Sequence, residues 1–217
     1  MKYVLMIITA LILLASSISA VFAEGKVTPI SWYGRVSMGF AAQTKKYIEV
    51  NRGQTEWDFK SGINYSVAAG YTVPYFALEG EFGYRKLDIA RKINTDGSPS
   101  TRYTGDQTQV SIMLNSYFIP KPEWKISPYI GLGVGTTSIS WNDVRSPAGS
   151  SVTDDSDTVF TYQLIAGASY KINPQFTLVA DYRYFVPGDL EIEVNGAESK
   201  LNNQELNIFN VALQFKL

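Results

Sequence analysis

Apolar side chains recur at every second position through most of the chain after residue 23, and this period limits the fold more than any other feature. A period of two places the apolar residues on one face of a β-strand, whereas an amphipathic helix has a period of 3.6 residues. Eight segments keep the pattern: residues 32–42, 63–73, 76–84, 110–118, 130–134, 162–172, 176–184 and 209–217. No convincing amphipathic helix accompanies them, so the sequence predicts an all-β protein.

The opposite face of these segments is polar or small, and its charged positions include Arg35, Glu79, Glu81, Arg85, Asp181 and Arg183. Alternation alone leaves two architectures open. A soluble sandwich or lipocalin-type barrel turns its apolar face inward, and a membrane barrel turns the same face outward.

The lengths of the connections favour the membrane barrel. Three links, "TVPY", "IPKPEWKIS" and "INPQ", are short and contain proline. The other four are long and polar: residues 43–57, 90–107, 141–158 and 186–205. Strict alternation of long and short connections is typical of transmembrane β-barrels of the bacterial outer membrane, which have short periplasmic turns. We therefore predict a single eight-stranded, antiparallel, up-and-down transmembrane β-barrel with both ends in the periplasm.

Aromatic residues gather near the ends of the predicted strands, where amphipathic rings of a membrane barrel meet the lipid headgroups. On the short-turn side we expect an interfacial girdle of Tyr75, Phe76, Tyr117, Phe118, Trp124, Tyr129, Tyr170, Phe176 and Phe215. Ordinary aromatic residues of a soluble β-rich core are the alternative.

Residues 1–23 are predicted to be a secretory signal peptide that is cleaved, leaving residues 24–217 as the barrel domain. Lys2 supplies the positive charge, residues 4–14 are apolar apart from one threonine, and Ala23 fits the small-residue cleavage rule. The apolar run is short of the roughly 20 residues that a membrane-spanning helix needs.

The amino-acid composition argues against several other classes of protein. The chain has no cysteine, so it holds no disulfide and no lipid-modified cysteine. Its 19 basic and 20 acidic residues give no reason to expect a nucleic-acid partner.

Several segments in this order resemble a known family: "WYGRVSMGFA", "SVAAGYTVPYFALEGEFGYR", "SIMLNSYF" with "PYIGLGVG", "YQLIAGASYKINPQFTLVADYRYF" and "NVALQFKL". They are similar to the eight-stranded outer-membrane β-barrel proteins of the surface-antigen and opacity type, which share the architecture of the OmpA and OmpX barrels. The resemblance covers nearly all of the chain after the predicted signal. It implies a place in the cell outer membrane, contact with membrane lipid and lipopolysaccharide, and insertion by the barrel-assembly machinery.

Three glycines, Gly131, Gly133 and Gly135, alternate along one predicted strand. A phosphate-binding loop would need G-x-G-x-x-G before a helix, and no helix begins after this stretch. We expect instead a stripe on the wall of a narrow lumen, where the missing side chains leave room for bulky or charged groups from other strands. Opposite charges are expected to meet across it.

The sequence gives little support for a catalytic site or a metal site. The chain has no histidine and no cysteine, which excludes triad, thiol and histidine-ligated metal chemistry. Glu79 and Glu81 could pair for acid–base work, but we expect them in a structural lumen charge network with Arg35, Arg85, Asp181 and Arg183, because buried charges must be paired. The stretch "TDDSDT" lacks the order of a calcium loop. We predict no cofactor, no metal and no enzyme.

Asn195 and Gly196 follow alternating apolar residues and favour a tight hairpin turn, so the last two strands should continue outside the membrane as a projecting ribbon. We expect a surface-exposed structural protein or antigen whose long extracellular loops contact or adhere to a host or environmental surface ligand. A small-conductance, porin-like channel is the alternative, and an enzyme comes third.

Overall fold

The structure, a computed structural model, describes residues 31–43, 46–50, 53–59, 61–94, 104–145, 151–153, 156–188, 190–194, 197–201 and 205–217. The predicted signal peptide, residues 1–23, lies outside these residues and stays a prediction. None of the described residues forms a helix long and apolar enough to span a membrane.

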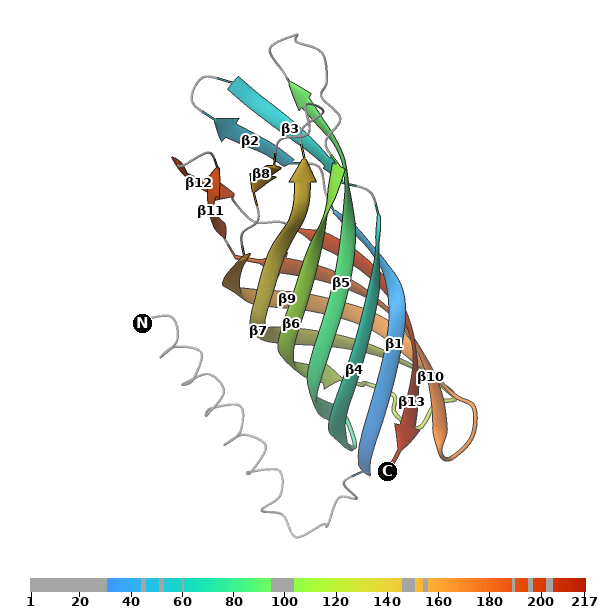
Figure 1. The fold of residues 1–217 in the computed structure, drawn as a ribbon. Helices are drawn as coiled ribbons and strands as arrows, with labels where there is room; N and C mark the ends of the chain where they lie inside the picture. The colour runs from blue at the N-terminus through green and yellow to red at the C-terminus, as the bar shows by residue number, and fades with distance from the viewer. Residues whose placement is uncertain are drawn as a thin grey trace, which may run out of the picture. The chain divides into compact units, whose positions relative to one another are not determined.

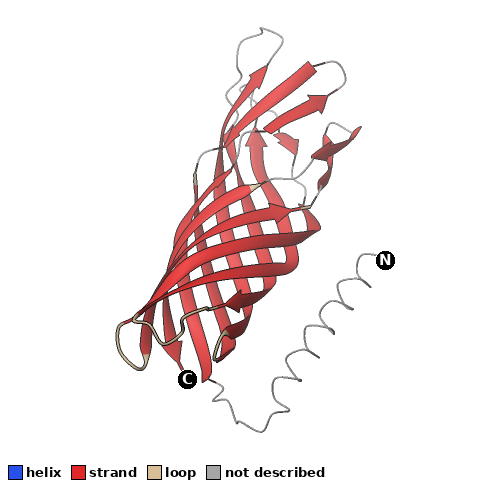
Figure 2. Cartoon of the chain, turned by 180° about the vertical axis from the view of Figure 1, so that it is seen from behind, coloured by secondary structure: helices blue, strands red, loops and turns tan. Residues whose placement is uncertain are grey.

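Eight long strands close into one antiparallel barrel, and every described element is a strand (Figures 1 and 2). In ring order they are β1 (Ser31–Gln43), β4 (Gly62–Val73), β5 (Phe76–Asn94), β6 (Thr104–Phe118), β7 (Ile126–Arg145), β9 (Ser156–Lys171), β10 (Phe176–Pro187) and β13 (Leu206–Lys216). Each pairs with the next. Pairing of β13 with β1, from Tyr33 opposite Lys216 to Gln43 opposite Leu206, closes the ring. The predicted eight-stranded barrel is confirmed.

Three short turns join neighbouring strands at one end of the barrel, which we call the short-turn end. Pro74 and Tyr75 alone separate β4 from β5. Residues 119–125 link β6 to β7, and residues 172–175 link β9 to β10. In the last turn the Asn173 side-chain oxygen accepts hydrogen bonds from the backbone nitrogens of Gln175 at 2.9 Å and Phe176 at 2.8 Å. The side-chain acceptor replaces strand pairing at the bend.

The strands reach much further than the apolar pattern predicts at the other end, which we call the long-loop end. β5 continues to Asn94 and β7 to Arg145, whereas the predicted segments end at residues 84 and 134. The long connections also contain short strands: β2 (Lys46–Val50), β3 (Gly53–Phe59) and β8 (Ser151–Thr153). β2 pairs with β3, β3 with β5 and β8 with β7. Backbone pairing needs no apolar face outside the lipid, so periodicity did not reveal these extensions.

The hairpin of the last connection differs from its prediction. β11 (Leu190–Val194) and β12 (Ala197–Leu201) pair with each other, with Val194 opposite Ala197. They form a separate two-stranded sheet and do not continue β10 and β13. Asn195 and Gly196 lie outside the described residues.

The apolar face of the barrel points outward. Phe40 is 68% exposed and Ile112 is 66% exposed, whereas their inward neighbours Ala41 and Ser111 are fully buried. This is the reverse of a soluble barrel, in which the apolar side chains fill the interior. A belt of exposed apolar residues around a closed ring, in which every strand pairs with a neighbour on each side, suits a lipid environment.

Candidate functional site

The lumen is filled by three layers of side chains, and β5 contributes to each. From the short-turn end its inward residues are Ala77, then Glu79 and Glu81, then Arg85 and Leu87, all buried. The layers are therefore one of tyrosines and small apolar residues, one of charges, and one of apolar residues around Arg85.

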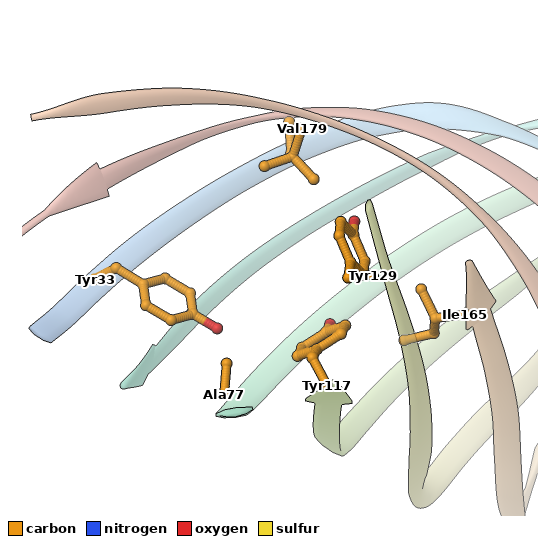
Figure 3. Close-up of a cluster of buried hydrophobic side chains, with 7 residues drawn as sticks. Tyr33, Ala77, Tyr117, Tyr129, Ile165 and Val179 are labelled. Atoms are coloured by element: carbon orange, nitrogen blue, oxygen red, sulfur yellow. The ribbon is translucent and has the colours of Figure 1, made fainter. Parts of the chain in front are cut away.

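Tyrosines close the short-turn end. Tyr33, Ala77, Tyr117, Tyr129, Ile165, Val179 and Ala212 form this buried layer, and Figure 3 shows the three phenol rings directed into the barrel. The rings of Tyr117 and Tyr129 meet edge to face, with centroids 5.5 Å apart. The hydroxyl groups of Tyr33 and Tyr117 both donate to the Glu79 carboxylate at 2.9 Å. The Tyr129 hydroxyl donates to Asp181 at 3.0 Å.

An ion pair crosses the middle of the bore. Arg183 on β10 places Nη1 2.7 Å from both carboxylate oxygens of Glu81 on β5. β10 and β5 are four strands apart in either direction around the ring of eight, so the pair joins opposite walls. Arg183 also donates from Nε to Asp181 Oδ1 at 2.8 Å. One guanidinium therefore bridges two carboxylates.

A second ion pair lies beside the first. Arg35 on β1 donates to Glu79, and its Nη1 lies 4.0 Å from Asp181 Oδ2. Asn115 donates to Glu79 at 3.2 Å, and Asn210 donates to Asp181 at 3.1 Å. We call Arg35, Glu79, Glu81, Asp181 and Arg183 the charge network. Its side chains are at most 3% exposed, so its charges depend on one another rather than on bulk water.

Arg85 differs from these five residues in its contacts, although its charge interacts with that of Glu81. Among the described residues it forms no ion pair with a carboxylate. Its guanidinium instead stacks on the Phe185 ring at 3.9 Å and donates to Ser111 Oγ at 3.0 Å. Next to it, toward the long-loop end, lies the apolar layer, which consists of Ala41, Leu87, Met113, Phe185, Leu206 and Ile208. The sequence placed Arg85 on the correct face but could not reveal its partners, because contacts across the bore depend on the stagger of strands that are distant in sequence.

The glycine stripe is occupied by neighbouring side chains, and the expectation that opposite charges meet across it is wrong. A Cβ on Gly131 would lie 2.6 Å from the Tyr117 ring, and one on Gly133 would lie 2.2 Å from Asn115 Oδ1. A Cβ on Gly135 would lie 2.0 Å from the Ile112 carbonyl oxygen. The glycines thus let side chains of β6 lie flat over β7, while the ion pairs join β1, β5 and β10.

Two aromatic residues of the predicted girdle belong to the lumen. Tyr117 and Tyr129 are 3% and 7% exposed, so their assignment to the lipid interface was wrong. The period of two contained the correct signal, because both have the parity opposite to that of their apolar neighbours Phe118 and Ile130. Tyr33 and Asn115 are further members of the site whose roles the sequence did not suggest.

The arrangement holds charges apart from water rather than presenting them to a substrate. Glu79 and Glu81 are each bound to a different arginine. No group of three or more acidic residues suited to a metal ion occurs within the described part of the chain. Of the stretch "TDDSDT", Asp154 and Asp155 lie outside the described residues.

Comparison with known proteins agrees with this architecture. Neisserial surface protein A (NspA) matches with a TM-score of 0.54 and 19% identity, over 87% of this chain and 99% of that one. Ail of Yersinia pestis, solved with the heparin analogue sucrose octasulfate, matches with a TM-score of 0.48 and 16% identity, over 86% and 99%. The outer membrane protease OmpT of Escherichia coli matches with a TM-score of 0.48 and 10% identity, over 88% and 99%.

At 19% identity the likeness to NspA shows the fold alone. No curated protein sequence matches the chain. A family model gives more direct evidence of the family. The model of the outer membrane protein beta-barrel domain matches residues 8–215 of this chain. The chain belongs to the family of outer membrane protein β-barrel domains and is a protein of the cell outer membrane.

Proposed function

We propose that the protein is a closed barrel anchor that carries a surface-exposed region for contact or adhesion, as a structural protein or antigen. The observation that carries this proposal is the blocked lumen. A tyrosine layer, a paired charge network and an apolar layer follow one another along the bore. A barrel built in this way supports what lies beyond the lipid rather than a flow through its centre.

The lengths of the strands support the same role. β7 has 20 residues, which at about 3.3 Å per residue extends about 66 Å along the strand. With a tilt of about 40°, that rises about 50 Å along the barrel axis, roughly twice the 25 Å apolar band of outer-membrane barrels. The extra length, with β2, β3, β8 and the β11–β12 hairpin, lies at the long-loop end (Figure 1). In the proposed orientation this end faces the exterior and both termini face the periplasm, after removal of residues 1–23 as a signal peptide.

The proposed partner is a ligand on a host or environmental surface, met by the long connections. Insertion by the barrel-assembly machinery, and contact of the outer half with lipopolysaccharide, belong to the same proposal. We propose no catalytic role, because both lumen glutamates are bound by arginines.

A small-conductance channel is the second candidate, and one observation favours it. Seven buried side-chain atoms have no hydrogen-bond partner in the described part of the protein, among them Arg35 Nε, Arg85 Nε and Gln163 Oε1. Buried polar atoms of this kind commonly bind internal water. Water in the lumen would let ions pass if the charge network opened.

Adhesion by intact cells tests the anchor role. Cells of a strain without adhesins of its own would produce the wild type, variants with each long connection shortened in turn, or Ser66→Ala as a control confined to the lumen. We expect the wild type and the control to hold cells on epithelial monolayers or bare glass, and at least one shortened variant to lose this retention. Equal retention by all variants at equal surface amounts, with steady ionic current through the wild type, would favour the channel.

A further inference from the structure

The turn between β6 and β7 is bound firmly to the neighbouring strand end. The backbone nitrogen of Lys171 on β9 donates to the carbonyl oxygen of Lys125 at 3.0 Å, and the Lys171 ammonium donates to the Pro122 carbonyl oxygen. At the same end of the turn, next to Lys125, Ser127 Oγ donates to the Trp124 carbonyl oxygen at 2.9 Å. The turn therefore holds Lys121, Lys125 and Lys171 close to one another at the short-turn end.

All three lysines are exposed, and two of them lie over exposed aromatic rings. The Lys121 ammonium lies 5.8 Å from the centre of the Trp124 ring, and the Lys125 ammonium lies 5.2 Å from that of Tyr170. Tyr170 follows the lipid-facing parity of β9 and is 38% exposed, and Trp124 is 53% exposed. The Lys125 ammonium thus lies beside the outer wall of the barrel, whereas Lys171 has the inward parity of β9 and reaches the turn through its bond to Pro122.

The level of these groups in the membrane follows from their aromatic neighbours. Tyrosine and tryptophan at the end of an apolar belt lie among the lipid headgroups. Phe118, Ile126 and Phe176 are exposed at the same end and continue the apolar belt. Ammonium groups beside such rings therefore lie at the depth of the lipid phosphates, and the turn carries only one opposing charge, Glu123.

We propose that Lys121, Lys125 and Lys171, with Trp124 and Tyr170, form a docking surface for the headgroup of an acidic phospholipid. Charge complementarity selects the lipid, because three ammonium groups on one segment of the rim favour a headgroup with net negative charge over a zwitterionic one. With the orientation proposed above, this lipid belongs to the periplasmic leaflet. The surface would hold one sector of the barrel at a fixed depth through lipid contacts alone.

Fluorescence quenching by brominated lipids tests this docking surface locally. A protein that keeps only Trp124, with Trp32, Trp57 and Trp141 changed to phenylalanine, is reconstituted in equal mixtures of phosphatidylglycerol and phosphatidylcholine, one of which is brominated. We expect brominated phosphatidylglycerol to quench Trp124 as if enriched about fivefold, which corresponds to about 1 kcal/mol for a lysine at an anionic surface. Raising the salt concentration should reduce the enrichment.

The chain offers a matched control on the opposite wall. Trp32 on β1 is 58% exposed at the same end, and β1 lies four strands from β7 in either direction. A protein that keeps only Trp32 should show little preference between the two lipids. In the Trp124 protein, Lys121→Gln with Lys125→Gln should remove the preference without touching the Lys171 contact that holds the turn. Lys86→Gln, at an exposed lysine paired with Asp106, should leave it unchanged.

The proposal is overturned if Trp124 is quenched equally by both lipids, or if the preference survives the double lysine substitution. An equal preference at Trp32 and Trp124 would also overturn it, because a general attraction of the barrel for acidic lipid would then explain the result. None of these outcomes depends on adhesion or conductance, so failure here leaves the proposed function intact.

Discussion

Arg183 and Glu81 join opposite walls of the barrel, with Arg183 Nη1 2.7 Å from both oxygens of the Glu81 carboxylate. Both side chains are at most 1% exposed. Removing two charges from water costs several kcal/mol for each ion, and their close contact offsets that cost. The pair therefore makes the closed state of the lumen depend on both residues together.

Glu81→Gln should destabilise the barrel by about 3 to 5 kcal/mol, because it removes the negative charge that faces the buried Arg183 guanidinium. Asp181 would remain as the one carboxylate bound to Arg183. The measurement is the free energy of unfolding in lipid vesicles, obtained by urea titration. Lys86→Gln removes an exposed pair with Asp106 at 3.3 Å and should cost at most about 1 kcal/mol.

The double variant Glu81→Gln with Arg183→Met separates pairing from general damage. We expect it to lose less stability than the sum of its single variants, because neither partner then remains as an unpaired buried charge. Strictly additive losses would contradict a direct interaction between the two side chains.

Leu114→Arg and Leu178→Arg should each cost about 2 to 4 kcal/mol if these positions lie near the membrane midplane. Both leucines are on the outward face, with exposed fractions of 36% and 42%. Ser66→Ala is the matched lumen control, since the Ser66 hydroxyl is buried and has no hydrogen-bond partner among the described residues. Equal losses for the leucine variants and the serine variant, in the same titration, would argue against a lipid-facing wall.

The period of two, together with the alternation of long and short connections, was sufficient to predict the barrel, and the period predicted the face of nearly every site residue. It assigned Arg35, Glu79 and Asp181 to the lumen because inward and outward residues alternate strictly along each strand. It could not predict which charges meet, because contacts across the bore depend on the stagger of strands that are distant in sequence. The contacts of Arg85 and the hydrogen bond of Tyr33 with Glu79 depend on that stagger.

Strand ends were predicted less well, for a different reason. The apolar pattern reports the part of a strand that contacts lipid, and "KLDIARKIN" at the end of β5 is polar on most positions. Pairing continues there because β3 and β6 offer backbone partners on either side. Partners of this kind cannot be recognised from one strand considered alone.

Gly133→Val should destabilise the barrel by about 1 to 3 kcal/mol, the usual cost of overpacking. A Cβ there would lie 2.2 Å from Asn115 Oδ1 and 2.7 Å from Gln163 Cγ, so both side chains must move. Gly80→Val is the matched control on the outward face of β5, where the nearest atom to a new Cβ is 4.0 Å away. Thermal unfolding in the same lipid should show the loss only for Gly133→Val, and equal losses would mean that backbone effects dominate.

A broad-specificity protease added to intact cells should cut within residues 43–57, 90–107, 141–158 or 186–205. The short turns at Pro74, Lys121 and Asn173 should be spared, because the proposed orientation places them in the periplasm. Mass spectrometry of the fragments identifies the cleavage sites, and cells with a permeabilised outer membrane provide the comparison. Cleavage at the short turns of unbroken cells, with the long connections intact, would show that the orientation is reversed.

Arg183→Ala should raise the ionic conductance of the barrel, whereas the wild type should pass little or only intermittent current in planar bilayers. The Arg183 side chain is the group that spans the bore to Glu81, and its removal deletes the bridge while leaving Glu81 and Asp181 without that partner. Water is then expected to enter between the two carboxylates, because unpaired buried charges are costly. Lys86→Gln serves as the control outside the bore, and cation selectivity of the new current would agree with a pore lined by the two carboxylates. A steady wild-type current as large as that of a general porin, unchanged by Arg183→Ala, would contradict the closed lumen and place the channel before the anchor as the function of this protein.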